Sequence, residues 1–175
     1  MWSRRDGAAA AMMRATACLA LLAMALLPGC GFHLRGDHAL PEQISPVQIT
    51  GIDRFSDFHR KLRFALMDNG IGIADGTDAR TQLVLQGFRG KEFVTALDRE
   101  GKAAEFELSR VVSFSLREKA TGQVLVPSRE LERRGIYADA PLTGFGITLQ
   151  REEIIAQLED QLVDDILSAI SLSLR

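Results

Sequence analysis

Few residues in this chain have the types and spacing that chemistry at a site requires. Its cysteines are Cys18 and Cys30, and its histidines are His33, His38 and His59. No two of them have the Cys-x-x-Cys or His-x-x-x-His spacing of a zinc-ligand pair. The sequence therefore predicts no metal site, no cofactor and no catalytic cysteine.

The acidic residues give no better case for catalysis. Glu152-Glu153 and Asp164-Asp165 are adjacent pairs, and neighbouring residues on a helix point in different directions. We expect both pairs to be solvated surface. Gly144-Phe145-Gly146 lacks the strand before it and the dinucleotide-binding spacing, so it indicates a loop rather than a phosphate site. We expect no catalytic residues and no enzyme activity.

Cys30 offers chemistry of another kind, because of what precedes it. Arginines at positions 4, 5 and 14 are followed by an apolar stretch, Ala15 to Leu27, and then by Pro28-Gly29. A basic start, a short apolar core and a small residue are typical of a secretory signal peptide. The apolar stretch of about 13 residues is too short for a membrane-spanning helix, the alternative, which needs about 20.

Leu27 and Gly29 resemble the lipobox of bacterial lipoproteins, although Pro28 departs from the residue usual at its place. The resemblance implies that residues 1–29 are cleaved and that a diacylglycerol is attached to the sulfur of Cys30. Two or more acyl chains give stable anchoring where one is marginal. Gly31, rather than an aspartate, follows the cysteine and indicates an outer-membrane destination. The leader could start at Met1, or at Met12 or Met13.

The chain left after cleavage is one ordinary domain of 146 residues. The leader holds three arginines and one aspartate, so 18 basic and 22 acidic residues remain. This acidic balance excludes a general nucleic-acid binder, and any contact with anionic lipid must use local basic residues. We interpret residues 30–45 as a lipidated tether and residues 46–175 as a single domain.

Hydrophobic patterning predicts the elements of that domain. Short strands are expected at 47–49 and 71–73, around a helix capped by Asp53 or Ser56 and ended by Asn69-Gly70. Strands follow near 83–97, 106–117 and from 124, with turns at 98–101 and 121–122 and an irregular loop at 138–149. A last helix begins near Glu152 and Glu153. Each helix is predicted by apolar residues at helical spacing. These are Phe55, Phe58, Leu62, Ala65 and Leu66 for the first helix and Ile155, Leu158, Leu162, Ile166 and Ile170 for the last.

This order predicts an α+β fold in which both helices cover one face of a mostly antiparallel sheet. The strand at 106–117 alternates most cleanly, with apolar residues on one face and polar residues on the other. Only Arg110 interrupts its apolar face.

Three segments carry a resemblance to a known family. The first is Cys30-Gly31-Phe32-His33-Leu34-Arg35-Gly36, and the second is the helix segment 62–70 with its Asn-Gly end. The third is the hairpin 99–106, which reads Arg-Glu-Gly-Lys-Ala-Ala-Glu-Phe. Together they resemble the LptE family of lipopolysaccharide-assembly lipoproteins.

The resemblance implies an α+β fold of two helices packed on one face of a four-stranded, mostly antiparallel sheet. It also implies a plug inside the outer-membrane β-barrel LptD, a contact with lipopolysaccharide, and a location in the barrel lumen or facing the periplasm. It aligns Arg99, with Lys102 beside it, with a basic residue that binds lipopolysaccharide. We expect Phe32, His33 and Arg35 to serve the tether or the contact with the barrel. The family's second basic residue has no clear counterpart, Arg151 being the nearest cation. The alternative is a free-standing lipoprotein that binds lipid or glycan without a barrel.

Overall fold

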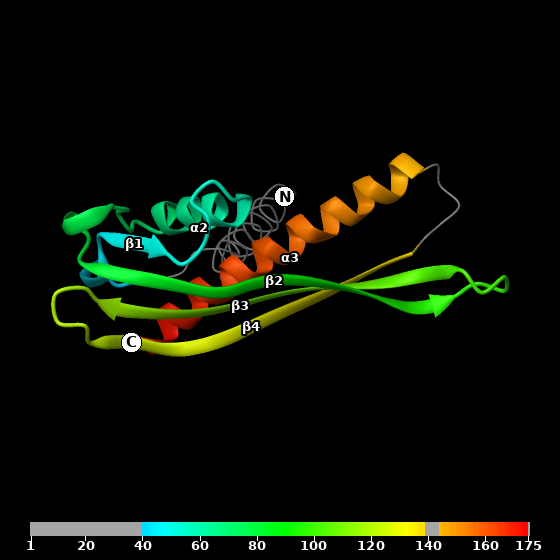
Figure 1. Ribbon diagram of the computed structural model, residues 1–175. Helices are drawn as coiled ribbons and strands as arrows, with labels where there is room; N and C mark the ends of the chain where they lie inside the picture. Colours follow the sequence, from blue (N-terminus) through cyan, green and yellow to red (C-terminus); the bar gives the residue numbers. More distant parts are fainter. Residues whose placement is uncertain (1–39, 139–143, 175) are drawn as a thin grey trace, which may run out of the picture. The chain divides into compact units, whose positions relative to one another are not determined.

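The computed structural model describes residues 40–138 and 144–174, with side chains from residue 149 onward in the second segment. All of them belong to one compact unit, Gly36–Arg175. The elements, shown in Figure 1, are η1 Glu42–Ile44, β1 Val47–Thr50, α2 Asp57–Asp68, η2 Gly76–Asp78, β2 Thr81–Leu97, β3 Ala103–Glu118, β4 Val124–Ala138 and α3 Gly144–Ser173.

The sheet has four strands in the order β1-β2-β3-β4. β1 runs parallel to the start of β2, and the other two pairings are antiparallel. Both helices pack on this sheet, so the predicted α+β class and the mostly antiparallel sheet are confirmed. The prediction of a strand at 71–73 is wrong, because this segment forms only a single parallel bridge between Ile73 and Val47.

α2 forms where the apolar stripe and the capping residues predict a helix. The Ser56 hydroxyl accepts a hydrogen bond from the His59 backbone N–H at 3.2 Å, which satisfies a free donor of the first turn. Phe58, Leu62 and Leu66 are buried. Phe55, which we placed in the same stripe, precedes the helix and is exposed.

α3 is longer than the sequence predicts. It runs for 30 residues from Gly144, so part of the expected 138–149 loop is helical, and Glu152 and Glu153 lie beyond the first two turns. Asp165, expected to be solvated, accepts two hydrogen bonds from Arg133 of β4, at 2.6 and 2.5 Å. The last helix is therefore tied to the sheet by charge as well as by its apolar stripe.

The apolar face of β3 turns toward the helices as predicted. Arg110 interrupts this face because it pairs with an acidic residue of α3. Its Nε lies 3.8 Å from Oε1 of Glu159, a buried carboxylate of α3. Lys61 of α2 lies 3.5 Å from Oε2 of the same residue. Two cations therefore surround one buried anion, which joins α2, α3 and β3 at a single point.

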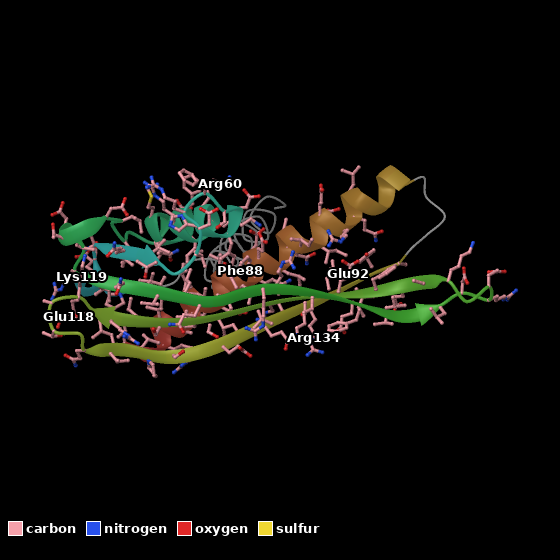
Figure 2. All side chains as sticks on the ribbon, in the orientation of Figure 1. Arg60, Phe88, Glu92, Glu118, Lys119 and Arg134 are labelled. Atoms are coloured by element: carbon pink, nitrogen blue, oxygen red, sulfur yellow. The ribbon has the colours of Figure 1, made fainter. Side chains whose placement is uncertain are left out.

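β2 changes phase along its length. Leu83 and Leu85 face the core, but the register with β3 shifts between Gln86 and Arg89. Beyond this bulge, Glu92 lies opposite Leu108 and so faces the helices. Figure 2 shows Glu92 between the sheet and α3, whereas Arg134 lies on the opposite face.

Two apolar clusters result, of unequal size. The larger joins β1, α2, the second half of α3, the start of β2, the end of β3 and the start of β4. Leu40 and Ile44 from the predicted tether are also part of it. The smaller consists of Leu108, Tyr137 and Leu158, with Phe106, Ile154 and Ile155 packed against it. The hairpin that joins β2 to β3 extends beyond this smaller cluster.

Candidate functional site

The turn between β2 and β3 is organised by one carboxylate. Oδ1 of Asp98 accepts hydrogen bonds from the backbone N–H groups of Glu100 and Lys102, at 2.9 and 2.8 Å. Gly101 has a φ of +80°, which a residue with a side chain adopts only with strain. The turn is thus held by its own backbone, and the side chains of Arg99 and Lys102 take no part in these bonds.

Arg99 and Lys102 are brought together on this turn, as the sequence predicts. Both are exposed, and neither forms an ion pair with any residue in the described ranges. Large apolar side chains of β2 stand next to the turn: Leu97 is 64 % exposed, and Phe93 and Val94 are each 51 % exposed. Cations above an apolar strand match a ligand that carries phosphates beside hydrocarbon.

Arg151 is engaged in a different way. Its Nε and Nη2 donate to Oε2 of Glu92 at 3.0 and 2.9 Å, and the Tyr137 hydroxyl donates to the other oxygen of Glu92. The bonds from Tyr137 and Arg151 lower the pKa of Glu92, while burial, followed by its bond to Glu92, raises the pKa of Tyr137 to about 12. Arg151 is therefore already paired with Glu92 and is a poor counterpart for a second ligand-binding cation.

Sequence reasoning missed Glu92 and Tyr137 because their placement depends on the bulge and on contacts across the sheet. It also missed a hollow beside α2 that three arginines and two exposed phenylalanines line. The only local signal for this hollow was the pair of aromatic residues Phe55 and Phe64, which the helical pattern assigned to the core or left unexplained.

Comparison with known proteins identifies the family. Residues 44–170 match the family described as LptE: Lipopolysaccharide-assembly. The chain belongs to the LptE family. An LPS-assembly lipoprotein LptE of Photorhabdus laumondii is 30 % identical over 148 residues, which cover 80 % of this chain and 76 % of the relative. The protein of the same name from Yersinia pestis is 28 % identical over 159 residues, covering 84 % and 72 %.

Solved structures agree on the fold. Rare lipoprotein B from Shewanella oneidensis superposes with a TM-score of 0.64 at 22 % identity, covering 74 % of this chain and 96 % of that one. Uncharacterized lipoprotein B from Nitrosomonas europaea gives a TM-score of 0.65 at 19 % identity, covering 81 % and 90 %. At these identities the likeness shows the fold alone.

Membership of the LptE family settles the broad class of the chain. It is a lipoprotein of the outer membrane that takes part in lipopolysaccharide assembly, and it is not an enzyme. Within residues 40–138 and 144–174, no cluster of His, Cys, Asp and Glu is arranged to hold a metal ion. Neither described helix is both long and apolar enough to cross a membrane.

The candidate residues of the N-terminal segment have no described position. Cys30, Phe32, His33 and Arg35 lie outside the described residues. Lipidation of Cys30 and a role of the other three in the tether or the barrel contact therefore stay predictions.

Proposed function

We propose that this LptE-family chain is held inside the outer-membrane β-barrel LptD and that its β2–β3 hairpin contacts lipopolysaccharide during insertion into the outer leaflet. Cys30 carries the lipid anchor, and the domain lies in the barrel lumen or faces the periplasm. The observation that carries this proposal is the turn at residues 98–102, where Arg99 and Lys102 stand exposed next to an apolar strand.

The chemistry of the hairpin suits the phosphorylated end of lipopolysaccharide. The planar guanidinium of Arg99 binds a phosphate through two parallel hydrogen bonds, whereas the ammonium of Lys102 acts as a point charge. Leu97 and Val94 offer apolar surface for the adjoining hydrocarbon. Because Asp98 fixes the turn, little ordering of the backbone is needed when a ligand binds.

The sheet face turned away from the helices suits a barrel wall. Arg89 pairs with Glu130 at 3.0 Å, and Arg134 pairs with Glu132 at 3.1 Å. Phe93 and Ile136, about half exposed, lie on either side of Glu107 on this face. Exposed apolar side chains bordered by charged ones fit a surface that a protein partner covers, in which an apolar core is surrounded by a polar rim.

Arg99→Asp tests the proposal. We expect lipopolysaccharide binding by the purified chain to weaken about tenfold or more, because one charge-assisted contact is replaced by repulsion. The amount of LptD that co-purifies from a detergent extract should stay unchanged. Arg129→Asp, the same charge change at an exposed site on β4, is the matched control and should affect neither measurement.

Two results would contradict the proposal. One is a chain that leaves the membrane without any barrel at native expression, which fits the free-standing alternative. The other is equal loss of lipopolysaccharide binding in Arg99→Asp and Arg129→Asp, which would show that the hairpin has no special part.

A further inference from the structure

The α2 hollow lies on the outer side of α2, away from the hairpin. Its volume is about 650 Å³. The lining residues come from the end of β1, the segment that leads into α2, α2 itself and the segment after it: Ile49, Arg54, Phe55, His59, Arg60, Arg63, Phe64, Met67, Ile73 and Asp75. β1 pairs with Thr81–Val84 at the start of β2, so this site and the 98–102 turn lie at opposite ends of that strand.

The hollow has an excess of positive charge. Arg60 pairs with Asp57 at 2.7 Å, but Arg54 and Arg63 form no ion pair within the described part of the chain. Asp75 is the one acid among the lining residues. Burial, and then the nearby charge of Arg63, lower the pKa of His59, while Asp75 acts in the opposite direction.

The hollow also exposes large apolar side chains. Phe55 is 80 % exposed, Phe64 56 % and Met67 47 %. Phe64 and Met67 follow Arg60 by four and seven residues, so all three share the face of α2 opposite its buried stripe. Figure 2 shows Arg60 on this outer side. Such a basic and aromatic mixture is typical of a helix that rests in the headgroup layer of a membrane.

The chain brings this surface within reach of a leaflet. Leu40 is buried in the same cluster as Phe58 and Leu62 of α2. A segment of about ten residues separates it from Cys30, and at full extension it spans at most about 36 Å. An anchor at Cys30 therefore limits how far Leu40, and the core that it shares with α2, can lie from the leaflet that holds the acyl chains, a step that depends on the lipidation in the proposed function.

We propose that the α2 hollow binds the surface of an anionic phospholipid leaflet. Arg54 and Arg63 bind lipid phosphates, while Phe55, Phe64 and Met67 enter the headgroup layer around them. This site is separate from the hairpin that contacts lipopolysaccharide. It orients the domain on its anchor, so that the lipid on Cys30 and the α2 hollow hold the chain at two points instead of one.

Vesicle flotation tests the inference without the acyl anchor. The mature chain, residues 30–175 with Cys30→Ser, is mixed with vesicles of phosphatidylcholine alone or of equal parts phosphatidylcholine and phosphatidylglycerol. We expect binding to the anionic vesicles that weakens as salt is added. The double variant Arg54→Glu, Arg63→Glu should bind at least about tenfold more weakly, since each arginine near an anionic surface strengthens binding about fivefold.

Controls separate this site from general charge effects. Arg117→Glu with Arg129→Glu makes the same charge change at exposed positions on β3 and β4, and it should bind less than about threefold more weakly, by long-range charge alone. Phe55→Ser with Phe64→Ser should lower the binding that persists at high salt. All these side chains are exposed, and unchanged circular dichroism and melting temperature confirm that each variant folds.

Several outcomes would overturn the inference. These are no binding to anionic vesicles, equal weakening by the two arginine pairs, or displacement of the chain from vesicles by millimolar inorganic phosphate, which indicates a free-phosphate site. Loss of LptD co-purification by Arg54→Glu, Arg63→Glu with vesicle binding intact would assign the surface to a protein partner. The assay contains neither barrel nor lipopolysaccharide, so failure of the proposed function leaves its result unaffected.

Discussion

At the scale of single residues, Glu92 connects the sheet to the first half of α3. It accepts hydrogen bonds from Tyr137 on β4 and from Arg151 on α3. These bonds lower its pKa below the ordinary value of 4.5. The native state therefore holds Glu92 ionised at a pH where the unfolded chain already binds a proton.

Glu92→Gln should lower the free energy of unfolding by about 1 kcal/mol at neutral pH, because a charge-assisted pair becomes a neutral one. The contribution of Glu92 is complete above the unfolded pKa of 4.5 and is lost as the pH falls through the lower native pKa. The difference between the wild type and the variant should therefore shrink as urea unfolding is repeated from pH 7 down to about pH 3.

A difference that stays constant over this range would show that Glu92 acts by packing and not by charge. Glu130→Gln is the matched control. Glu130 pairs with Arg89 on the exposed sheet face, where ion pairs contribute about 0–1 kcal/mol, so its removal should have little effect at any pH.

At the scale of elements, the sequence predicts helix caps and the buried faces of helices and strands, because these depend only on the spacing of nearby residues. The Ser56 cap, the buried stripe of α2 and the apolar face of β3 are visible in the sequence and confirmed. The expected alternation of buried and solvated residues in β3 is wrong in part, because Ser109 and Ser115 on its polar face are buried. The start of α3 was placed too late because Gly144 and Gly146 resemble a loop, and glycine is tolerated near a helix end. The bulge in β2 was missed because alternation cannot show where a strand shifts register.

Close approach of α3 to β4 depends on Gly135. A Cβ at this position would lie 2.8 Å from Cγ2 of Ile154 and 3.5 Å from Cδ2 of Leu158. Gly135→Val should therefore push α3 from the sheet and destabilise the domain by about 2 kcal/mol, measured by thermal unfolding. Because valine favours strands, a loss of stability cannot come from strand propensity.

Ile136→Val provides the comparison for this substitution. Ile136 is the next residue of β4 and is exposed, so the variant should change stability by less than about 0.5 kcal/mol. If Gly135→Val were as stable as the wild type, Ile154 of α3 would have to lie farther from β4 than the 2.8 Å that separates its Cγ2 from a Cβ at position 135.

At the scale of the whole molecule, the sequence places the hairpin site but cannot pair residues that are distant along the chain. Asp98-Arg99-Glu100-Gly101 is a turn by composition alone, so exposure of Arg99 and Lys102 follows from it. The contact of Glu92 with Arg151 joins residues 59 apart. No local pattern encodes such a contact, and the α2 hollow likewise needs β1, α2 and the segment after α2 to be folded together.

Stability should also be unequal along the sheet, since its two ends rest on clusters of different size. Opening the hairpin end exposes the small cluster around Leu108 and Tyr137, whereas opening the other end exposes the main core. The free energy of local opening rises with the apolar area exposed. Hydrogen exchange should therefore be faster for amides of residues 104–108 than for those of residues 112–116 in the same strand, β3. Glu92→Gln should speed exchange in the first group and leave the second nearly unchanged. Equal rates in the two groups would instead indicate one cooperative unit, with the hairpin as firmly held as the core.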